Sequence, residues 1–131
     1  MMNKEENESK NLRYEYLDGN SNQYLIEKED KIIIEYIPIK PYQSSSRIYD
    51  GGDYIKKEIS KLQYNQLKKS FNDTFKNKEI HIKDRVKRSG MIIIQEKSEK
   101  KICIINPDSQ ELQKIENNLK YLIKTQIIKK F

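Results

Sequence analysis

Two stretches of the chain hold residue types that could bind a partner by direct contact. The first, residues 42–54, reads YQSSSRIYDGGDY. Tyrosine offers a large contact area at low entropy cost, and serine and glycine adapt to a partner's surface. Tyrosine and arginine are also enriched among the residues that dominate binding energy at protein interfaces. The composition predicts a partner-binding surface made of Tyr42, Arg47, Tyr49, Asp50, Gly51, Gly52 and Tyr54.

The second stretch is basic. Residues 79–88, EIHIKDRVKR, alternate between apolar and polar positions, which is typical of a half-exposed strand. The polar side and the end of this predicted strand carry His81, Lys83, Arg85, Lys87 and Arg88. Lys and Arg neutralise phosphates without reading base sequence, so this basic face is an alternative site, for nucleic acid. The strand lacks the interleaved aromatic residues that stack on single-stranded bases.

The chain offers little material for catalysis. His81 is the only histidine and Cys103 the only cysteine, so these residue types cannot complete a zinc site. There is no H-E-x-x-H, G-x-S-x-G, C-x-x-C or phosphate-binding glycine motif. Asp50 and Asp53 flank two glycines, but their spacing matches no calcium loop. We therefore expect a protein that is not an enzyme and needs no metal or cofactor. Carboxylates that meet only in the folded chain stay open as an alternative.

Charge is distributed unevenly along the chain. Residues 1–59 hold nine Lys and Arg against twelve Asp and Glu, a net of −3, whereas residues 60–131 hold seventeen against eight, a net of +9. This asymmetry indicates a partner with an acidic contact surface, or a solvated lysine-rich face. Isoleucine dominates the apolar residues, alanine is absent and valine occurs once. Such a composition is typical of an AT-rich bacterial genome, which weakens a functional interpretation of lysine abundance alone.

Several features bear on the compartment. No apolar stretch approaches the about 20 residues of a membrane span, so we expect a soluble protein without a membrane span. The start, MMNKEENESKN, lacks the apolar core of a signal peptide. A single cysteine cannot form an internal disulfide. We expect a cytoplasmic protein, with a leader removed from a longer precursor as the alternative. Residues 1–12 are predicted as a disordered polar tail and residues 13–131 as a single domain.

The sheet elements are expected to centre on residues 91–105, MIIIQEKSEKKICII. Two apolar runs joined by a short polar turn predict an antiparallel hairpin. Because the runs do not alternate, they indicate strands covered on both faces. Earlier in the chain, residues 13–17, 23–27 and 31–37 predict a β-meander. Residues 45–49 and 54–58 predict a further hairpin around the Gly51-Gly52 turn.

Two amphipathic helices are expected to cover this sheet. One spans about residues 60–75 and starts at a capping box formed by Ser60 and Gln63. The other opens at Asp108, after Pro107. The prediction is an α+β fold, a mostly antiparallel sheet with both helices packed on it, in the order strands, helix, strands, helix. The predicted core residues are Ile32, Ile34, Leu67, Phe71, Ile93, Ile104, Ile115 and Leu119.

These expectations favour a small non-catalytic protein-binding module, of the inhibitor or immunity type. It would present the Tyr/Ser/Gly-rich hairpin and the basic strand face to a protein partner that is acidic at its contact surface. The order of sheet, Gly-Gly turn, helix, hairpin and helix resembles that of small bacterial peptidase inhibitors. The alternative function is sequence-independent binding of nucleic acid by the basic strand.

Overall fold

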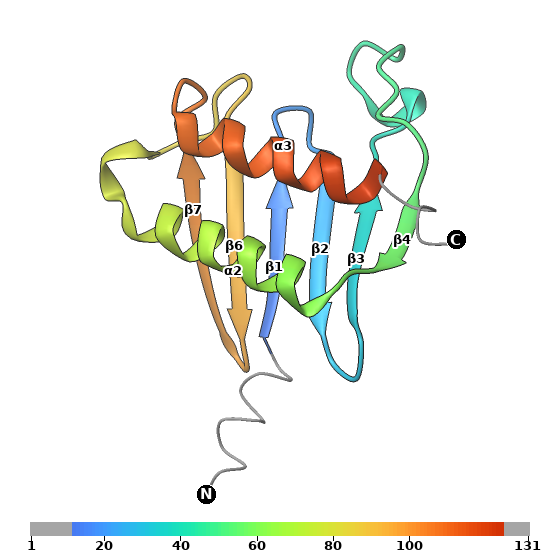
Figure 1. The fold of residues 1–131 in the computed structure, drawn as a ribbon. Coiled ribbons are helices and arrows are strands. Elements are labelled where there is room, and N and C mark those ends of the chain that lie inside the picture. Colours follow the sequence, from blue (N-terminus) through green and yellow to red (C-terminus); the bar gives the residue numbers. More distant parts are fainter. Residues whose placement is uncertain (1–11, 125–131) are drawn as a thin grey trace, which may run out of the picture.

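A computed structural model describes residues 12–124, which form one sheet and two long helices (Figure 1). Neighbouring strands pair antiparallel in the order β4-β3-β2-β1-β6-β7-β5. The strands are β1 (Leu12–Leu17), β2 (Gln23–Lys28), β3 (Ile32–Ile37), β4 (Ile55–Glu58), β5 (His81–Ile82), β6 (Gly90–Glu96) and β7 (Glu99–Ile105). The helices are α2 (Lys61–Lys76) and α3 (Gln110–Lys124), with the 3-10 turns η1 (Pro41–Gln43) and η2 (Lys78–Ile80). The predicted α+β fold and its element order are confirmed.

The capping chemistry of the two helices explains where they begin. The Ser60 hydroxyl accepts a hydrogen bond from the Gln63 backbone N–H at 3.1 Å, and the Gln63 side chain accepts from the Ser60 N–H at 2.9 Å. The predicted capping box is therefore present. For α3 the predicted start at Asp108 is wrong, because the capping hydroxyl belongs to Ser109, which accepts from the Leu112 N–H at 3.3 Å. Asp108 instead donates its N–H to the Asn106 side chain at 2.9 Å.

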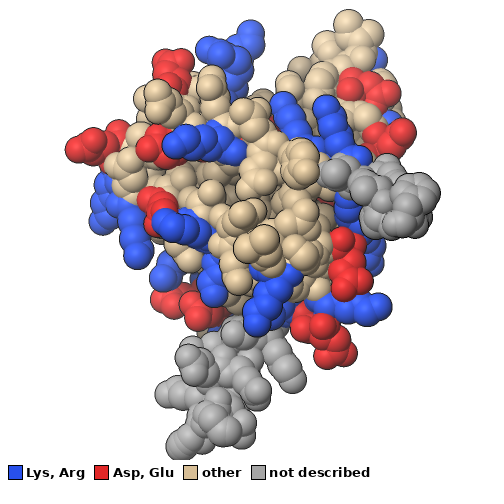
Figure 2. Space-filling model, viewed as in Figure 1, with Lys and Arg blue, Asp and Glu red and all other residues tan. Residues whose placement is uncertain are grey.

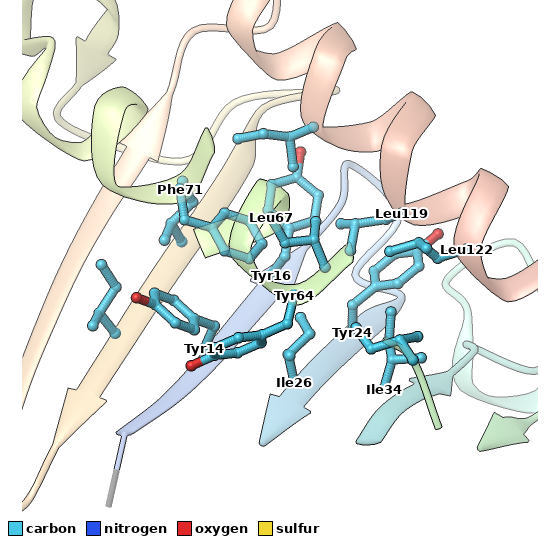
Figure 3. Close-up of a cluster of buried hydrophobic side chains, with 14 of the residues drawn as sticks. Tyr14, Tyr16, Tyr24, Ile26, Ile34, Tyr64, Leu67, Phe71, Leu119 and Leu122 are labelled. Carbon is cyan, nitrogen blue, oxygen red and sulfur yellow. The ribbon is translucent and has the colours of Figure 1, made fainter. Parts of the chain in front are cut away.

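Both helices lie across the same face of the sheet (Figure 1), and the core fills the space between. Strand residues alternate between this face and the opposite one, as the period of two requires. The helix-facing positions of the first three strands hold four tyrosines among isoleucines, and Tyr14 stacks on Phe71 of α2 with ring centroids 5.3 Å apart. Figure 3 shows the rings of Tyr14, Tyr16 and Tyr24 beside the residues of the two helices. The buried tyrosines are Tyr14, Tyr16, Tyr24, Tyr36 and Tyr64.

Seven of the eight predicted core residues are buried, and Ile104 is only partly so. Ile93 alternates with the core residues Ile92 and Ile94, so it lies on the sheet face away from the helices, as does its strand partner Ile102, which is 52% exposed. The prediction of burial on both faces is therefore wrong for β7, whereas in β6 the consecutive residues Ile92, Ile93 and Ile94 are all buried. The unbroken apolar runs of the two strands supply helix-facing residues such as Ile92 and Ile105 and, in alternate positions, apolar residues on the other face such as Ile93 and Ile102.

The predicted basic strand over residues 79–88 is mostly wrong. Only His81 and Ile82 form β5, paired with Ile105 and Ile104 of β7, and residues 83–89 belong to no helix or strand. The reason is that Arg85 hydrogen-bonds two backbone carbonyls, those of Ser89 at 2.8 Å and Asp18 at 2.9 Å. These bonds fold the segment back on itself and against the β1–β2 turn.

The predicted hairpin over residues 45–58 is also wrong. Residues 44–54 contain no strand, and β4 pairs with β3 instead, with Glu58 opposite Ile33 and Ile55 opposite Tyr36. The segment from residue 40 to residue 54, named here the 40–54 loop, projects beyond the end of the sheet beside β4 (Figure 1).

At the start of the described chain, β1 begins at Leu12, which is the last residue of the predicted tail. The rest of that tail lies outside the described residues.

Candidate functional site

The base of the 40–54 loop is held by one buried side chain, Asn22, which is 2% exposed. Its amide nitrogen donates to the Asp18 carboxylate at 2.9 Å and to the Tyr49 hydroxyl at 2.7 Å. Its amide oxygen accepts from the Ile39 backbone N–H at 2.8 Å. Asn22 therefore joins the β1–β2 turn, the chain after β3 and the returning arm of the loop at a single point.

A second set of contacts closes the loop. The Gly51 N–H donates to the Ile39 carbonyl at 2.8 Å, and the Gly51 carbonyl accepts from the Tyr36 hydroxyl at 2.6 Å. The Lys40 ammonium donates to the Asp50 carboxylate at 2.9 Å and to the Gly52 carbonyl at 2.7 Å. The hydrogen bond from Lys40 is the main cause that lowers the pKa of Asp50. The loop is therefore fixed at both arms.

Gly51 is required by close packing rather than by a turn at a hairpin tip. A Cβ atom at this position would lie 2.2 Å from the Asn22 side-chain oxygen and 3.0 Å from the Ile39 nitrogen. Gly52 differs, since it has a φ of +105° and open space around it. A left-handed φ of this size favours glycine. The two glycines predicted to form a projecting tip belong to the base of the loop.

The outer part of the loop exposes large apolar side chains. Tyr42 is 74% exposed, Ile48 is 78% exposed and Tyr54 is 54% exposed. Arg47 is also exposed and has a φ of 66°. The Tyr54 hydroxyl is held by the Glu35 carboxylate. Figure 2 shows the projecting end of this loop, at the upper right, mostly in the colour of uncharged residues.

The seven residues predicted for partner binding thus divide into two groups. Tyr42, Arg47 and Tyr54 lie on the exposed part of the loop. The other four take part in its framework, through the contacts with Asn22, Tyr36 and Lys40: Tyr49, Asp50, Gly51 and Gly52. Sequence reasoning missed Ile48, although it stands between Arg47 and Tyr49 in the same stretch.

A cleft of about 620 Å³ opens beside the base of the loop. It is bounded by the β1–β2 turn, by residues 49–55, by residues 87–88 and by α3. Its lining includes the tyrosines Tyr24, Tyr36 and Tyr49 and the acid Glu116 of α3. No sequence motif could have indicated it, because its walls come from segments far apart in the chain.

Glu116 is an acid of the cleft whose pKa is raised by this setting. One of its carboxylate oxygens accepts a hydrogen bond from the Tyr16 hydroxyl at 2.7 Å. Burial raises the pKa of Glu116, the Asp18 charge raises it further, and the bond from Tyr16 opposes both. The pKa of the Tyr16 hydroxyl is raised both by burial and by the charge of Glu116.

The basic residues do not form one continuous face. His81 uses Nε2 to donate to the Thr74 carbonyl at 3.0 Å, and Arg85 is bound to backbone carbonyls as described above. Lys83, Lys87 and Arg88 are exposed. On the helix-covered face, Lys and Arg side chains are spread among acidic ones (Figure 2). The structure therefore leaves three of the five predicted basic residues available to solvent.

Within residues 12–124, no cluster of three or more His, Cys, Asp or Glu could hold a metal ion. Cys103 is 7% exposed, and burial raises the pKa of its thiol to about 11. A thiol in this setting is a poor nucleophile, because the thiolate is the reactive form.

Neither described helix is both long and apolar enough to cross a membrane. Comparisons of the chain with protein-family models, with curated proteins and with solved structures found no match.

Proposed function

We propose that this protein is a non-catalytic protein-binding module, of the inhibitor or immunity type, which presents the 40–54 loop to a protein partner. The observation that carries the proposal is the exposure of Tyr42, Ile48 and Tyr54 on one projecting segment. Apolar side chains gathered on a rigid projection are typical of surfaces that a partner covers.

The fixed base of the loop supports the same proposal. Binding a mobile loop costs about 0.5–1.5 kcal/mol for each side chain that becomes ordered, and fixing the loop beforehand reduces that cost. Here Asn22, Tyr36 and Lys40 hold both arms of the loop before any partner arrives. Tyr42 and Tyr54 would then supply contact area, and the Tyr54 hydroxyl already donates to the Glu35 carboxylate.

Quantitative affinity enrichment with three tagged baits tests this proposal. The baits are the wild type, a loop variant Tyr42→Ser/Ile48→Ser, and a control variant Leu62→Ser/Val86→Ser. Leu62 and Val86 are exposed apolar residues outside the loop, at 68% and 52%, so the control removes similar apolar surface elsewhere. A true partner should be enriched by the wild type and the control but not by the loop variant.

The partner found in this way is then purified for titration. The loop variant should bind it at least about 30-fold more weakly, which corresponds to about 2 kcal/mol, the scale of an interface hot spot. Equal affinity for the wild type and the loop variant would remove the loop from the proposal. A failure of all three baits to enrich any protein would count against the protein-binding function itself.

The alternative function is sequence-independent binding of nucleic acid through Lys83, Lys87 and Arg88, which are exposed on neighbouring turns. It is the weaker proposal, because His81 and Arg85 are engaged within the fold. Fluorescence anisotropy with labelled duplex and single-stranded oligonucleotides tests it. Affinity should fall steeply with added salt, because bound Lys and Arg release counterions. Absence of binding at low salt would end this alternative.

A further inference from the structure

The floor of the cleft carries a tyrosine hydroxyl that no described group hydrogen-bonds. Tyr24 is 2% exposed and lines the cleft, and Figure 3 shows its hydroxyl turned toward α3. Within residues 12–124 no group hydrogen-bonds this hydroxyl. Among the described residues no side-chain nitrogen or oxygen is both fully buried and without a partner, so the Tyr24 hydroxyl opens onto the space of the cleft. A tyrosine with a buried ring and an accessible hydroxyl is suited to a hydrogen bond with a bound molecule.

Glu116 supplies a second polar group on the same floor. Tyr16 occupies one of its carboxylate oxygens, and an ionised carboxylate has room for about four hydrogen bonds. No cation within the described chain lies close enough to Glu116 to form an ion pair. Lys120 is near enough only to lower the pKa of the Glu116 carboxyl by its charge. The half-buried carboxylate therefore lacks a direct counter-ion.

The surroundings of these two groups favour a cation. Burial is the main cause that raises the pKa of Tyr24, and the Asp18 and Glu116 carboxylates raise it further by their charges. These two carboxylates make the floor electronegative. The Tyr24 and Tyr36 rings lie with centroids 4.8 Å apart, and aromatic faces attract ammonium and guanidinium groups. The floor thus combines a carboxylate, a free hydroxyl and tyrosine rings.

The rim of the cleft has the opposite charge. Lys87, Arg88, Lys120 and Lys124 line it, and all four are exposed. A free metal ion or a simple cation would meet this rim unfavourably. A molecule with a cation at one end and a carboxylate or phosphate at the other would place its cation on the electronegative floor and its anion against the basic rim. A volume of about 620 Å³ also lies within the usual range of small-molecule sites, about 300–1,000 Å³.

We propose that this cleft binds an organic cation, an alkylammonium or guanidinium group, with Glu116 as its counter-ion and the Tyr24 hydroxyl as a hydrogen-bond acceptor. An anionic group on the same molecule meets the lysines and arginine of the rim. The cation is carried either by a free small molecule or by a Lys or Arg side chain of a protein. The proposal does not require that the 40–54 loop bind a partner.

A titration of the ¹⁵N-labelled full chain, followed by two-dimensional NMR, tests the proposal. N-acetyl-arginine carries a guanidinium and a carboxylate, and N-acetyl-citrulline has the same shape without the positive charge. The arginine probe should give saturable shifts at residues around the cleft and bind at least about tenfold more tightly than the citrulline probe. Equal binding of both probes, or shifts confined to residues away from the cleft, would overturn the proposal.

Three variants connect the binding to the named groups. Glu116→Gln removes the charge and should weaken the arginine probe at least about tenfold, a loss of about 1.4 kcal/mol. Tyr24→Phe removes only the hydroxyl and should weaken it about three- to tenfold. Glu99→Gln makes the same charge change at an exposed position of β7 and should leave binding unchanged. Wild-type affinity in both cleft variants would overturn the proposal, and the NMR spectra report directly whether each variant is folded.

Two further probes separate the sources of the cation. Free arginine is a small molecule with a guanidinium and a carboxylate, and acetyl-Gly-Arg-Gly with a free C-terminal carboxylate places the same two groups within a peptide backbone. Tighter binding of the peptide supports a protein side chain as the natural occupant, and tighter binding of arginine supports a small molecule. Binding of neither, together with no binding of N-acetyl-arginine, would refute the organic-cation site.

Discussion

Replacing Asn22 with alanine is expected to be among the most damaging single changes in the chain, although Asn22 is a polar residue next to a turn. The variant loses the side-chain hydrogen bonds with Asp18, Tyr49 and Ile39. Each is worth about 1 kcal/mol net, and a buried donor left without a partner costs about 1–3 kcal/mol more. The expected loss is about 3–5 kcal/mol, a large part of the about 5–15 kcal/mol that stabilises a typical domain.

Urea unfolding followed by far-UV circular dichroism measures this loss. With an m-value of about 2 kcal/mol/M, the midpoint should fall by about 2 M. Asn20→Ala is the matched control, since Asn20 is exposed and contributes only its backbone N–H to the Asp18 carboxylate. Asn22→Asp keeps an oxygen for the Ile39 amide but sets a like charge against Asp18, so it should also destabilise. If Asn22→Ala unfolds within about 1 kcal/mol of Asn20→Ala, the network does not hold the loop.

Three further predictions follow from buried groups. Phe71 is fully buried, so Phe71→Ala should cost about 3–5 kcal/mol in the same urea assay; wild-type stability would contradict its place in the core. The raised pKa of Glu116 means that the folded state holds this proton more tightly, so the stability of the wild type relative to Glu116→Gln should fall as pH rises from about 4 to about 7. A pH-independent difference in urea midpoints would refute this. The Cys103 thiol should react with a thiol-specific disulfide reagent far more slowly in the folded protein than in denaturant, and equal rates would contradict its burial.

The two helices could be predicted because their signals are local. The capping box of Ser60 and Gln63 and the stripe that includes Leu67 and Phe71 lie within a few turns of one another. The buried apolar positions of α3, including Ile115 and Leu119, follow the same helical period. Such patterns do not depend on distant parts of the chain, so the sequence alone contains them.

The strand predictions failed where a distant contact decides the structure. Residues 79–88 alternate like a strand, but the Arg85 guanidinium bonds the Asp18 carbonyl, which is 67 residues away in sequence. Residues 45–49 could have paired with residues 54–58, but the Gly51 N–H bonds the Ile39 carbonyl instead. A period of two is satisfied by many short segments, and only the folded chain shows which of them find a neighbour.

The cleft was beyond prediction for a related reason. Its floor joins Tyr24 of β2 to Glu116 of α3, and nothing in either stretch distinguishes these residues from other tyrosines and glutamates. Tyrosine is also an ambiguous signal, since its ring suits a core and its hydroxyl suits a surface. The predicted core was therefore built from isoleucine, leucine and phenylalanine and left the five buried tyrosines out.

A core built from tyrosine is a core that can lose protons. Burial raises the pKa of Tyr14 and of Tyr36 to about 12, and it raises the pKa of Tyr16, Tyr24 and Tyr64 as well. Unfolded tyrosines ionise near pH 10, so the unfolded chain releases protons that the folded chain keeps. Five such groups lower the free energy of unfolding by up to about 7 kcal/mol for each pH unit above about 10. The protein should therefore unfold within a narrow range of alkaline pH, and tyrosinate absorbance should appear together with the loss of helix. A core of phenylalanine in place of tyrosine would have no such groups to ionise, so its stability would not fall in this way.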